Sequence, residues 1–286
     1  MLLGVSIVFV LVGAAGFVWW WNLQPWVIRV EAAQLDVPGD GFSHNGFEEL
    51  LVRFVDARGY VAYEKWLAND EAVAALDAYL ATVAAISPEN APDRFRTRAD
   101  RLSYWLNVYN ASVIKAVLVN WPLESVTDVT APIEVVTGLG FFAKQRFVVG
   151  GKEYSLYDLE RSKIRDEFED PRVHFVLNCA SGSCPILRPE LPQGSALEEY
   201  LTHAAREFVG EERNVRIDHG ARRVVLSNIF AMYEKEFVND LRRRGVPGGV
   251  LAYVQSVAPA DLRSQLDEAS DYTVEYDEFD WSLNAQ

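Results

Sequence analysis

The chain has 286 residues, and 41 acidic side chains outnumber 27 basic ones, which gives a formal net charge of −14. Half of the residues are hydrophobic and 24% are charged, so the composition is globular and wholesale disorder is excluded. The acidic balance argues against a nucleic-acid partner, because phosphate binding needs a basic surface. The two cysteines, Cys179 and Cys184, are too few for a disulfide scaffold.

The N-terminus has the composition of a membrane span. Residues 2–21 contain no charged side chain, and a helix of about 20 residues crosses the hydrocarbon core of a bilayer. Trp19, Trp20 and Trp21 follow where an interfacial aromatic belt is expected. These features predict a single transmembrane anchor over residues 1–28. A cleaved signal peptide is the alternative, because small residues stand at positions 13–16.

The charge of the flanking segment predicts the orientation. Between residues 22 and 50, Arg29 is the only Lys or Arg, whereas cytoplasmic flanks are usually rich in both. We therefore expect the body of the protein outside the cytoplasm, in a bacterial periplasm or at the cell surface. The expected partners are the membrane, through the N-terminal helix, and an envelope peptide, polymer or protein.

The remaining elements follow from hydrophobic periodicity and from turn residues. Residues 29–44 contain Gly, Pro, Asp and Ser, which predicts a linker. Alternation around Gly150–Gly151 and His219–Gly220 predicts two β-hairpins, and residues 173–179 predict a buried strand. Helices are expected over residues 47–55, 70–86, 93–120, 156–168 and 195–209. The sum predicts one α+β domain over residues 45–286, with a mostly helical N-terminal half packed on a small antiparallel sheet.

The segment 170–185 carries the strongest chemical signal. An apolar strand would lead into a turn of small polar residues that contains Cys179. A thiol there is a nucleophile if a base such as His174 lies nearby, but it is equally a buried thiol or the partner of Cys184 in a disulfide. In a regular strand His174 and Cys179 lie about 16 Å apart on opposite faces, so a dyad needs the strand to end or bulge.

Further polar residues accompany this segment. Asn107 and Asn110 lie on the predicted helix 93–120, where a buried amide either ties the helix to a loop or orients a catalytic group. Tyr109 and Tyr233 are interpreted as core residues. The cysteine spacing does not fit a structural zinc site, so we assign no metal and no cofactor. Binding or structural roles are assigned to Glu160, Arg165, Arg172, Ser181 and Cys184.

Several motifs together resemble the domain-of-unknown-function family five-four-seven. They are Tyr104-Trp105-Leu106-Asn107-Val108-Tyr109-Asn110-Ala111, Ser155-Leu156-x-x-Leu159-Glu160, Asp170-Pro171-Arg172-Val173-His174-Phe175, Cys179-Ala180-Ser181, Cys184-Pro185, Leu226-Ser227-x-Ile229-Phe230 and Asp280-Trp281-Ser282-Leu283-Asn284. The clustered His, Cys and Asn of this family imply a cysteine-hydrolase core of the papain or transglutaminase kind. One position departs from the family pattern, because Arg161 stands where a His is common.

Two functions from different classes are compatible with these residues. In the first, the protein is a membrane-anchored thiol hydrolase or acyltransferase. Cys179 attacks an amide or acyl carbonyl and His174 transfers the proton, while Asn107 or Asn110 orients the histidine or stabilises the oxyanion. In the second, it is a non-catalytic envelope binding or scaffold module whose cysteines are bridged or buried. A buried disulfide without a cleft beside His174 would favour the second function.

Overall fold

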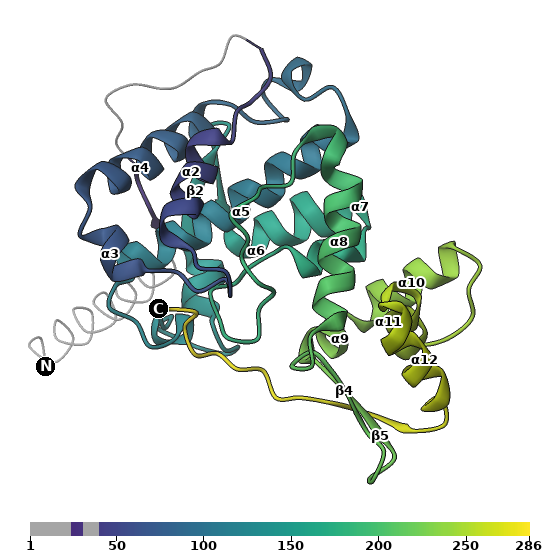
Figure 1. The fold of residues 1–286 in the computed structure, drawn as a ribbon. Helices are drawn as coiled ribbons and strands as arrows, with labels where there is room; N and C mark the ends of the chain where they lie inside the picture. The colour runs from purple at the N-terminus through teal and green to yellow at the C-terminus, as the bar shows by residue number, and fades with distance from the viewer. Residues whose placement is uncertain (1–23, 31–39) are drawn as a thin grey trace, which may run out of the picture.

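The structure is a computed structural model that describes residues 24–30 and 40–286. Most of its elements are helices, and the long helix α5 (Arg98–Asn120) runs through the centre of the fold (Figure 1). Before α5 come α2 (Asn45–Phe54), α3 (Tyr63–Leu67) and α4 (Asp70–Ala85). After it come α6 (Leu156–Asp158), the π-helix η4 (Leu159–Arg165), α7 (Asp166–Phe168), the 3₁₀-helix η5 (Pro171–Phe175), α8 (Leu197–Gly210), α9 (Asn228–Met232), α10 (Glu234–Arg243), α11 (Val250–Val257) and α12 (Ala260–Glu268).

Local sequence signals fix the limits of α5. The Thr97 hydroxyl accepts a 3.0 Å hydrogen bond from the Asp100 amide, and the Asp100 carboxylate accepts one from the Thr97 amide, which makes a capping box. The helix ends before Trp121–Pro122, because a proline cannot continue it. Its side chains are almost all buried between α3, α4, α8 and η4, so α5 organises the core.

Two three-stranded sheets flank the helices. The first pairs β1 (Trp26–Val27) in parallel with β2 (Gln145–Val149), and β2 in antiparallel with β3 (Lys152–Ser155). The second pairs β4 (Val215–Asp218) in antiparallel with β5 (Arg223–Leu226), and β5 in parallel with β6 (Thr273–Tyr276). Both predicted hairpins are confirmed. The prediction of a single small antiparallel sheet is wrong, because each of the two sheets includes a parallel strand from a distant part of the chain.

The predicted fold class included an N-terminal transmembrane helix, and the structure does not support that part of the prediction. Within the described residues, every helix is either too short or too polar to cross a membrane. Most of the predicted anchor, residues 1–23, lies outside the described residues. Its described end is not helical: Trp26 and Val27 form β1, and the Ile28 amide donates to the Arg146 carbonyl over 2.8 Å. The backbone there is satisfied by strand pairing with β2.

The C-terminal residues after β6 form a strap that returns across the molecule, drawn in yellow in Figure 1. Asn284 fastens its end. The Asn284 amide donates to the Ala180 carbonyl over 3.1 Å, and its carbonyl accepts from the Val61 amide over 2.8 Å. Its buried side chain accepts from the Tyr63 hydroxyl over 2.9 Å. The strap therefore joins the loop that contains the cysteines to the segment between α2 and α3.

Replacing Asn284 by Ala should lower the free energy of unfolding by about 2 kcal/mol, because the buried Tyr63 hydroxyl loses its acceptor. Urea unfolding measures the change. The control is Asn239→Ala on the exposed surface of α10, which should change the value by less than about 0.5 kcal/mol. Equal effects of the two substitutions would mean that the strap contributes nothing specific.

Candidate functional site

A cavity of about 550 Å³ lies beside His174. Its lining combines the segment 136–143, the turn after η5, α9 and the C-terminal strap. The titratable acid, base and cation of the lining are Glu160, His174 and Arg165, and the Cys179–Cys184 pair forms part of the wall. Hydroxyl groups come from Tyr109, Thr137, Tyr157 and Tyr233. Most other lining residues are apolar: Val136, Leu139, Phe142, Ala143, Leu177, Ile229, Met232, Phe279 and Trp281. The predicted site residues His174, Cys179, Cys184, Glu160 and Arg165 therefore meet at one cavity.

The predicted strand over residues 173–179 is wrong. Asp170 caps a 3₁₀-helix by accepting a 3.0 Å hydrogen bond from the Arg172 amide, and Pro171 occupies the first helical position. A proline there has the backbone angle that a helix start requires. The buried apolar run fits this short helix as well as a strand, because periodicity does not distinguish the two over so few residues. The change of geometry places His174 and Cys179 on the same cavity.

His174 is held by two contacts from the C-terminal helices. Its Nε2 lies 2.8 Å from a carboxylate oxygen of Glu236, and its ring stacks on that of Tyr233 at a centroid distance of 3.6 Å. The carboxylate assigns the proton of a neutral imidazole to Nε2. The other nitrogen, Nδ1, then presents a lone pair, and among the described residues it has no hydrogen-bond partner.

Arg165 connects Glu160 to Glu236. Its Nε donates to Glu236 over 2.9 Å, and its Nη1 donates to Glu160 over 3.2 Å. The same Glu160 oxygen accepts from the Tyr233 hydroxyl over 2.9 Å, and the guanidinium lies 4.7 Å from the centre of the Tyr233 ring. Glu160 and Arg165 thus form an ion pair. Arg172 does not join them and pairs with Asp170 and Glu198 instead.

This cluster changes the ionisation of its members. Burial alone would favour the neutral form of Glu236, but hydrogen bonds from His174 and Arg165 outweigh it and lower the pKa of Glu236 to about 2. Burial, together with the charge of Glu160, raises the pKa of Tyr233 and of Tyr109 far above the ordinary tyrosine value. At neutral pH the site therefore contains an ionised Glu236 carboxylate beside neutral tyrosine hydroxyls.

Cys179 and Cys184 form a disulfide. The Ser181 hydroxyl lies 3.0 Å from the Cys179 sulfur and 3.2 Å from that of Cys184. The loop between the cysteines is fastened to the strap, because the Gly182 amide donates to the Ser282 carbonyl over 2.8 Å. Of the three interpretations of Cys179, namely a nucleophile, a buried thiol and a disulfide partner, the structure agrees with the disulfide partner. A thiolate mechanism would require reduction first.

The two asparagines of α5 do not line the cavity, and only Asn110 holds a segment that leads to its wall. Asn110 donates to the Val176 carbonyl over 3.1 Å and accepts from the Asn178 amide over 2.9 Å, so it fixes the turn that leads to Cys179. Asn107 donates to the Pro192 carbonyl over 3.1 Å. Both amides are buried. Their hydrogen bonds match the interpretation in which the two amides tie the helix to loops.

The residues that sequence reasoning missed are Glu236, Phe279 and Trp281, and Tyr233 was assigned to the core alone. Glu236 pairs with a histidine 62 positions earlier, and no local pattern predicts such a contact. A weak signal exists, because Glu236 borders a buried stripe at helical spacing. The stripe consists of Phe230, Tyr233, Phe237 and Leu241. Within the described part of the chain, no group of His, Cys, Asp and Glu is arranged to hold a metal ion.

Comparison with known families now identifies the central part of the fold. Residues 93–209 match the model of the family described as "Protein of unknown function, DUF547". The chain thus carries a DUF547 domain there, which confirms the resemblance over a shorter range than the residues 45–286 for which the motifs predicted it. No curated protein and no solved structure matches the chain. The expected papain-like or transglutaminase-like core is not supported, since His174 and Cys179 both lie outside the sheets.

The low pKa of Glu236 makes its contribution to stability depend on pH. Its pKa lies below the ordinary value of 4.5, so the ionised form stabilises the fold above about pH 4.5 and this contribution is lost as the pH falls toward 2. Glu236→Gln should cost about 2 kcal/mol at pH 7 and much less at pH 3, measured by urea unfolding. The control is Glu268→Gln, an exposed residue on α12. A cost for Glu236→Gln that does not change with pH would contradict the assignment.

Proposed function

We propose that this protein binds an apolar or amphipathic small molecule in the cavity beside His174, as a non-catalytic binding module of the cell envelope. The observation that carries the proposal is the cavity itself. Its volume of about 550 Å³ lies in the range of small-molecule sites, and its lining is mostly apolar with a few convergent polar groups.

The polar part of the lining favours a ligand with a hydrogen-bond donor. One Glu160 oxygen accepts from both Arg165 and Tyr233, and the other has no partner among the described residues. The Nδ1 atom of His174 is a second acceptor. Arg165, the cation of the lining, is already engaged by two carboxylates. An amide or hydroxyl on an apolar body is therefore the chemistry that the cavity would accept.

Of the two features expected of a non-catalytic module, the disulfide is present, whereas a cavity does lie beside His174. The disulfide supports both the binding interpretation and the location. It removes the free thiol that a cysteine-dependent reaction needs. Disulfides persist mainly in oxidising compartments, which favours a place outside the cytoplasm. We therefore infer that the body of the protein faces the periplasm or the cell surface and meets an envelope peptide, polymer or other envelope ligand there.

N-phenyl-1-naphthylamine, a neutral apolar probe with one N–H donor, tests the binding function. The fluorescence of the probe should rise as protein is added and should level off once all of the probe is bound. Ala143→Phe fills the cavity and should weaken binding by about tenfold or more. The control Ala74→Phe lies on the exposed face of α4 and should bind as the parent does. The proposal fails if binding does not saturate, or if both variants bind equally well.

A second candidate function is hydrolysis, and the His174–Glu236 pair favours it. A carboxylate that orients an imidazole, with the other nitrogen free, is the arrangement of a general base. In the oxidised protein His174 would activate water. After reduction by an external thiol, the Cys179 thiol would attack an acyl carbonyl and His174 would take its proton. The alcohol or amine would leave with that proton, and water would then cleave the Cys179 thioester and release the acid.

Hydrolysis of p-nitrophenyl butyrate separates the two functions. A hydrolase should show saturable turnover that falls about 100-fold or more in His174→Gln. If Cys179 is the nucleophile, turnover should also require a reductant and be lost in Cys179→Ser. The binding module should show no turnover above buffer in either redox state. Turnover that survives His174→Gln would exclude His174 as the base.

A further inference from the structure

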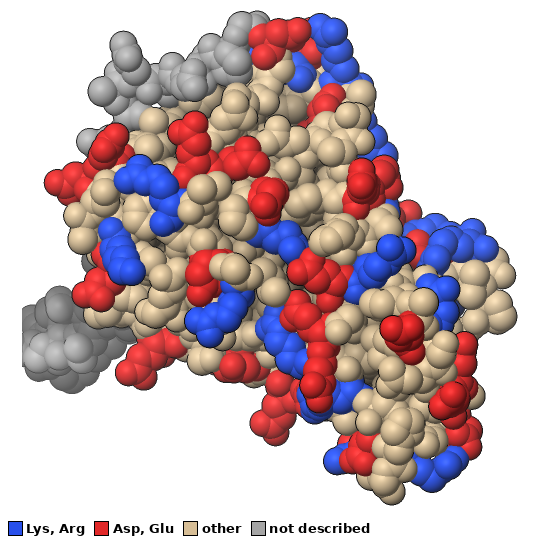
Figure 2. All heavy atoms as spheres, viewed as in Figure 1, with Lys and Arg blue, Asp and Glu red and all other residues tan. Residues whose placement is uncertain are grey.

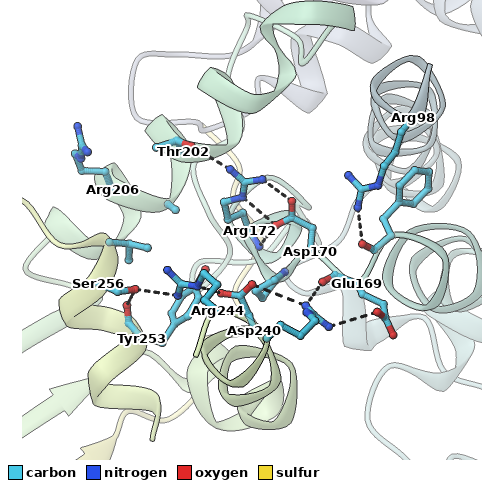
Figure 3. Close-up of a pocket in the computed structure, with 15 residues that line it drawn as sticks. Arg98, Glu169, Asp170, Arg172, Thr202, Arg206, Asp240, Arg244, Tyr253 and Ser256 are labelled. Carbon is cyan, nitrogen blue, oxygen red and sulfur yellow. Dashed lines mark hydrogen bonds and ion pairs between the residues drawn. The ribbon is translucent and has the colours of Figure 1, made fainter. Parts of the chain in front are cut away.

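A second cavity, of about 570 Å³, lies between α8, α10, α11 and the segment around η5 (Figure 3). Its lining is basic, although the chain as a whole carries a net charge of −14. Figure 2 shows Lys and Arg side chains gathered over this part of the molecule. Five arginines line the cavity: Arg98, Arg172, Arg206, Arg243 and Arg244. Three carboxylates line it as well, and a fourth, Glu198, pairs with Arg172 from outside the lining, so the formal balance is 5 − 4 = +1.

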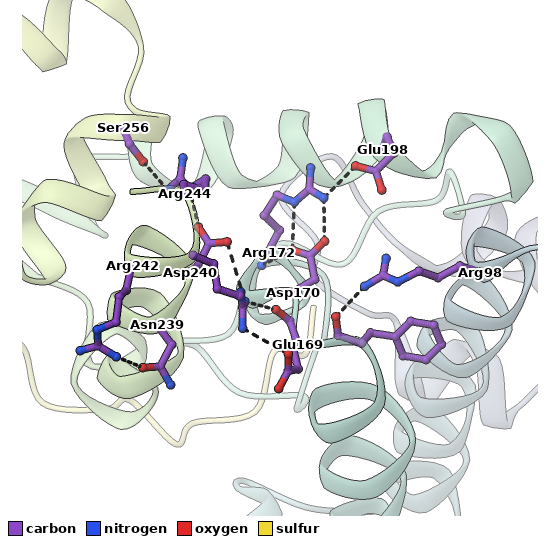
Figure 4. Close-up of polar contacts among 12 residues, drawn as sticks. Arg98, Glu169, Asp170, Arg172, Glu198, Asn239, Asp240, Arg242, Arg244 and Ser256 are labelled. Atoms are coloured by element: carbon purple, nitrogen blue, oxygen red, sulfur yellow. Dashed lines mark hydrogen bonds and ion pairs between the residues drawn. The ribbon is translucent and has the colours of Figure 1, made fainter. Parts of the chain in front are cut away.

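The carboxylates of the lining are engaged by three of the arginines (Figure 4). Arg172 holds Asp170 with two hydrogen bonds, from Nε over 2.9 Å and from Nη2 over 2.6 Å. Arg244 pairs with Asp240 over 2.8 Å, and Arg243 pairs with Glu169 over 3.4 Å. Burial opposes the charge of Asp170, but Arg172 outweighs it and lowers the pKa of that carboxyl, so the pair remains ionised.

The remaining two arginines have no carboxylate partner among the described residues. Arg98 donates to the Phe168 carbonyl over 2.5 Å, and its guanidinium lies 5.1 Å from the centre of the Phe168 ring. Arg206, exposed on α8, makes no hydrogen bond or ion pair with any described residue. Figure 3 shows the two on opposite sides of the cavity, with Arg172 between them. Arg98 and Arg206 are thus the two guanidiniums of the lining that have no ion pair with a described carboxylate, although the charge of Arg98 contributes to lowering the pKa of Asp170.

We propose that this cavity binds a small molecule that carries phosphate groups. Guanidinium groups bind phosphate oxygens through paired, charge-assisted hydrogen bonds, and the lining offers two guanidiniums, Arg98 and Arg206, that hold no carboxylate. The volume is that of a small-molecule site. Because Arg98 and Arg206 lie on opposite sides, a diphosphate or a molecule with two separated phosphates uses both of them.

Isothermal titration with sodium pyrophosphate, at constant low ionic strength, tests the site. One equivalent should bind. Arg206→Gln should weaken binding about fivefold, and Arg98→Gln combined with Arg206→Gln about 20-fold or more. The control is Arg53→Gln on α2. Like Arg206, Arg53 is exposed and has no carboxylate partner among the described residues. Like Arg98, its guanidinium lies near an aromatic ring, 5.2 Å from the centre of Phe54. This variant should bind as the parent does.

Two results would overturn the proposal: a pyrophosphate response no larger than that of sodium chloride at equal ionic strength, or equal weakening by Arg53→Gln and Arg206→Gln. Arg206→Gln decides the question even if Arg98→Gln impairs folding, because the Arg206 side chain holds no described residue in place. Cosedimentation with phosphatidylcholine vesicles containing phosphatidic acid identifies the source. Binding that depends on Arg206 assigns the phosphate to a lipid, and pyrophosphate binding without cosedimentation assigns it to a soluble molecule.

Discussion

The site depends on Arg165, which is held between Glu160 of its own helix and Glu236 of α10. The cluster is partly buried, and the loss of one member would leave another charge uncompensated in a region of reduced dielectric. Glu236 in turn fixes His174, and Glu160 fixes Tyr233, on which His174 stacks. One cation thus sets the positions of the groups that give the cavity its polar chemistry.

This arrangement makes the C-terminal part of the chain a component of the site. The DUF547 match covers residues 93–209 and includes His174, Cys179 and the Glu160–Arg165 pair. Tyr233, Glu236 and the aromatic residues of the strap come from beyond that segment. The two cavities also share elements, because η5 contributes Arg172 to one and His174 to the other. The helix α10 holds Asp240 at the first and Glu236, one turn earlier, against His174 at the second.

The sequence predicted what local signals determine. The helix end at Trp121–Pro122 and the turn at Gly150–Gly151 depend on residues within a few positions of each other. The start of that helix was predicted at residue 93 but lies at Arg98, after the Thr97 cap. The short helix at His174 was mistaken for a strand because its proline start was outweighed by an apolar run. The parallel strands β1 and β6 and the pairing of His174 with Glu236 are contacts between distant residues, which periodicity does not predict. The resemblance to DUF547 located the chemistry, whereas only the structure paired the cysteines.

A double-mutant cycle between Arg165 and Glu236 tests the central claim most directly. Arg165→Met, Glu236→Gln and the double variant would be unfolded in urea at pH 7 and compared with the parent. If the cluster fastens α10 to the DUF547 segment, the coupling free energy should be at least about 1 kcal/mol. Effects that add to within about 0.4 kcal/mol would show that the two residues act independently, which would contradict the account.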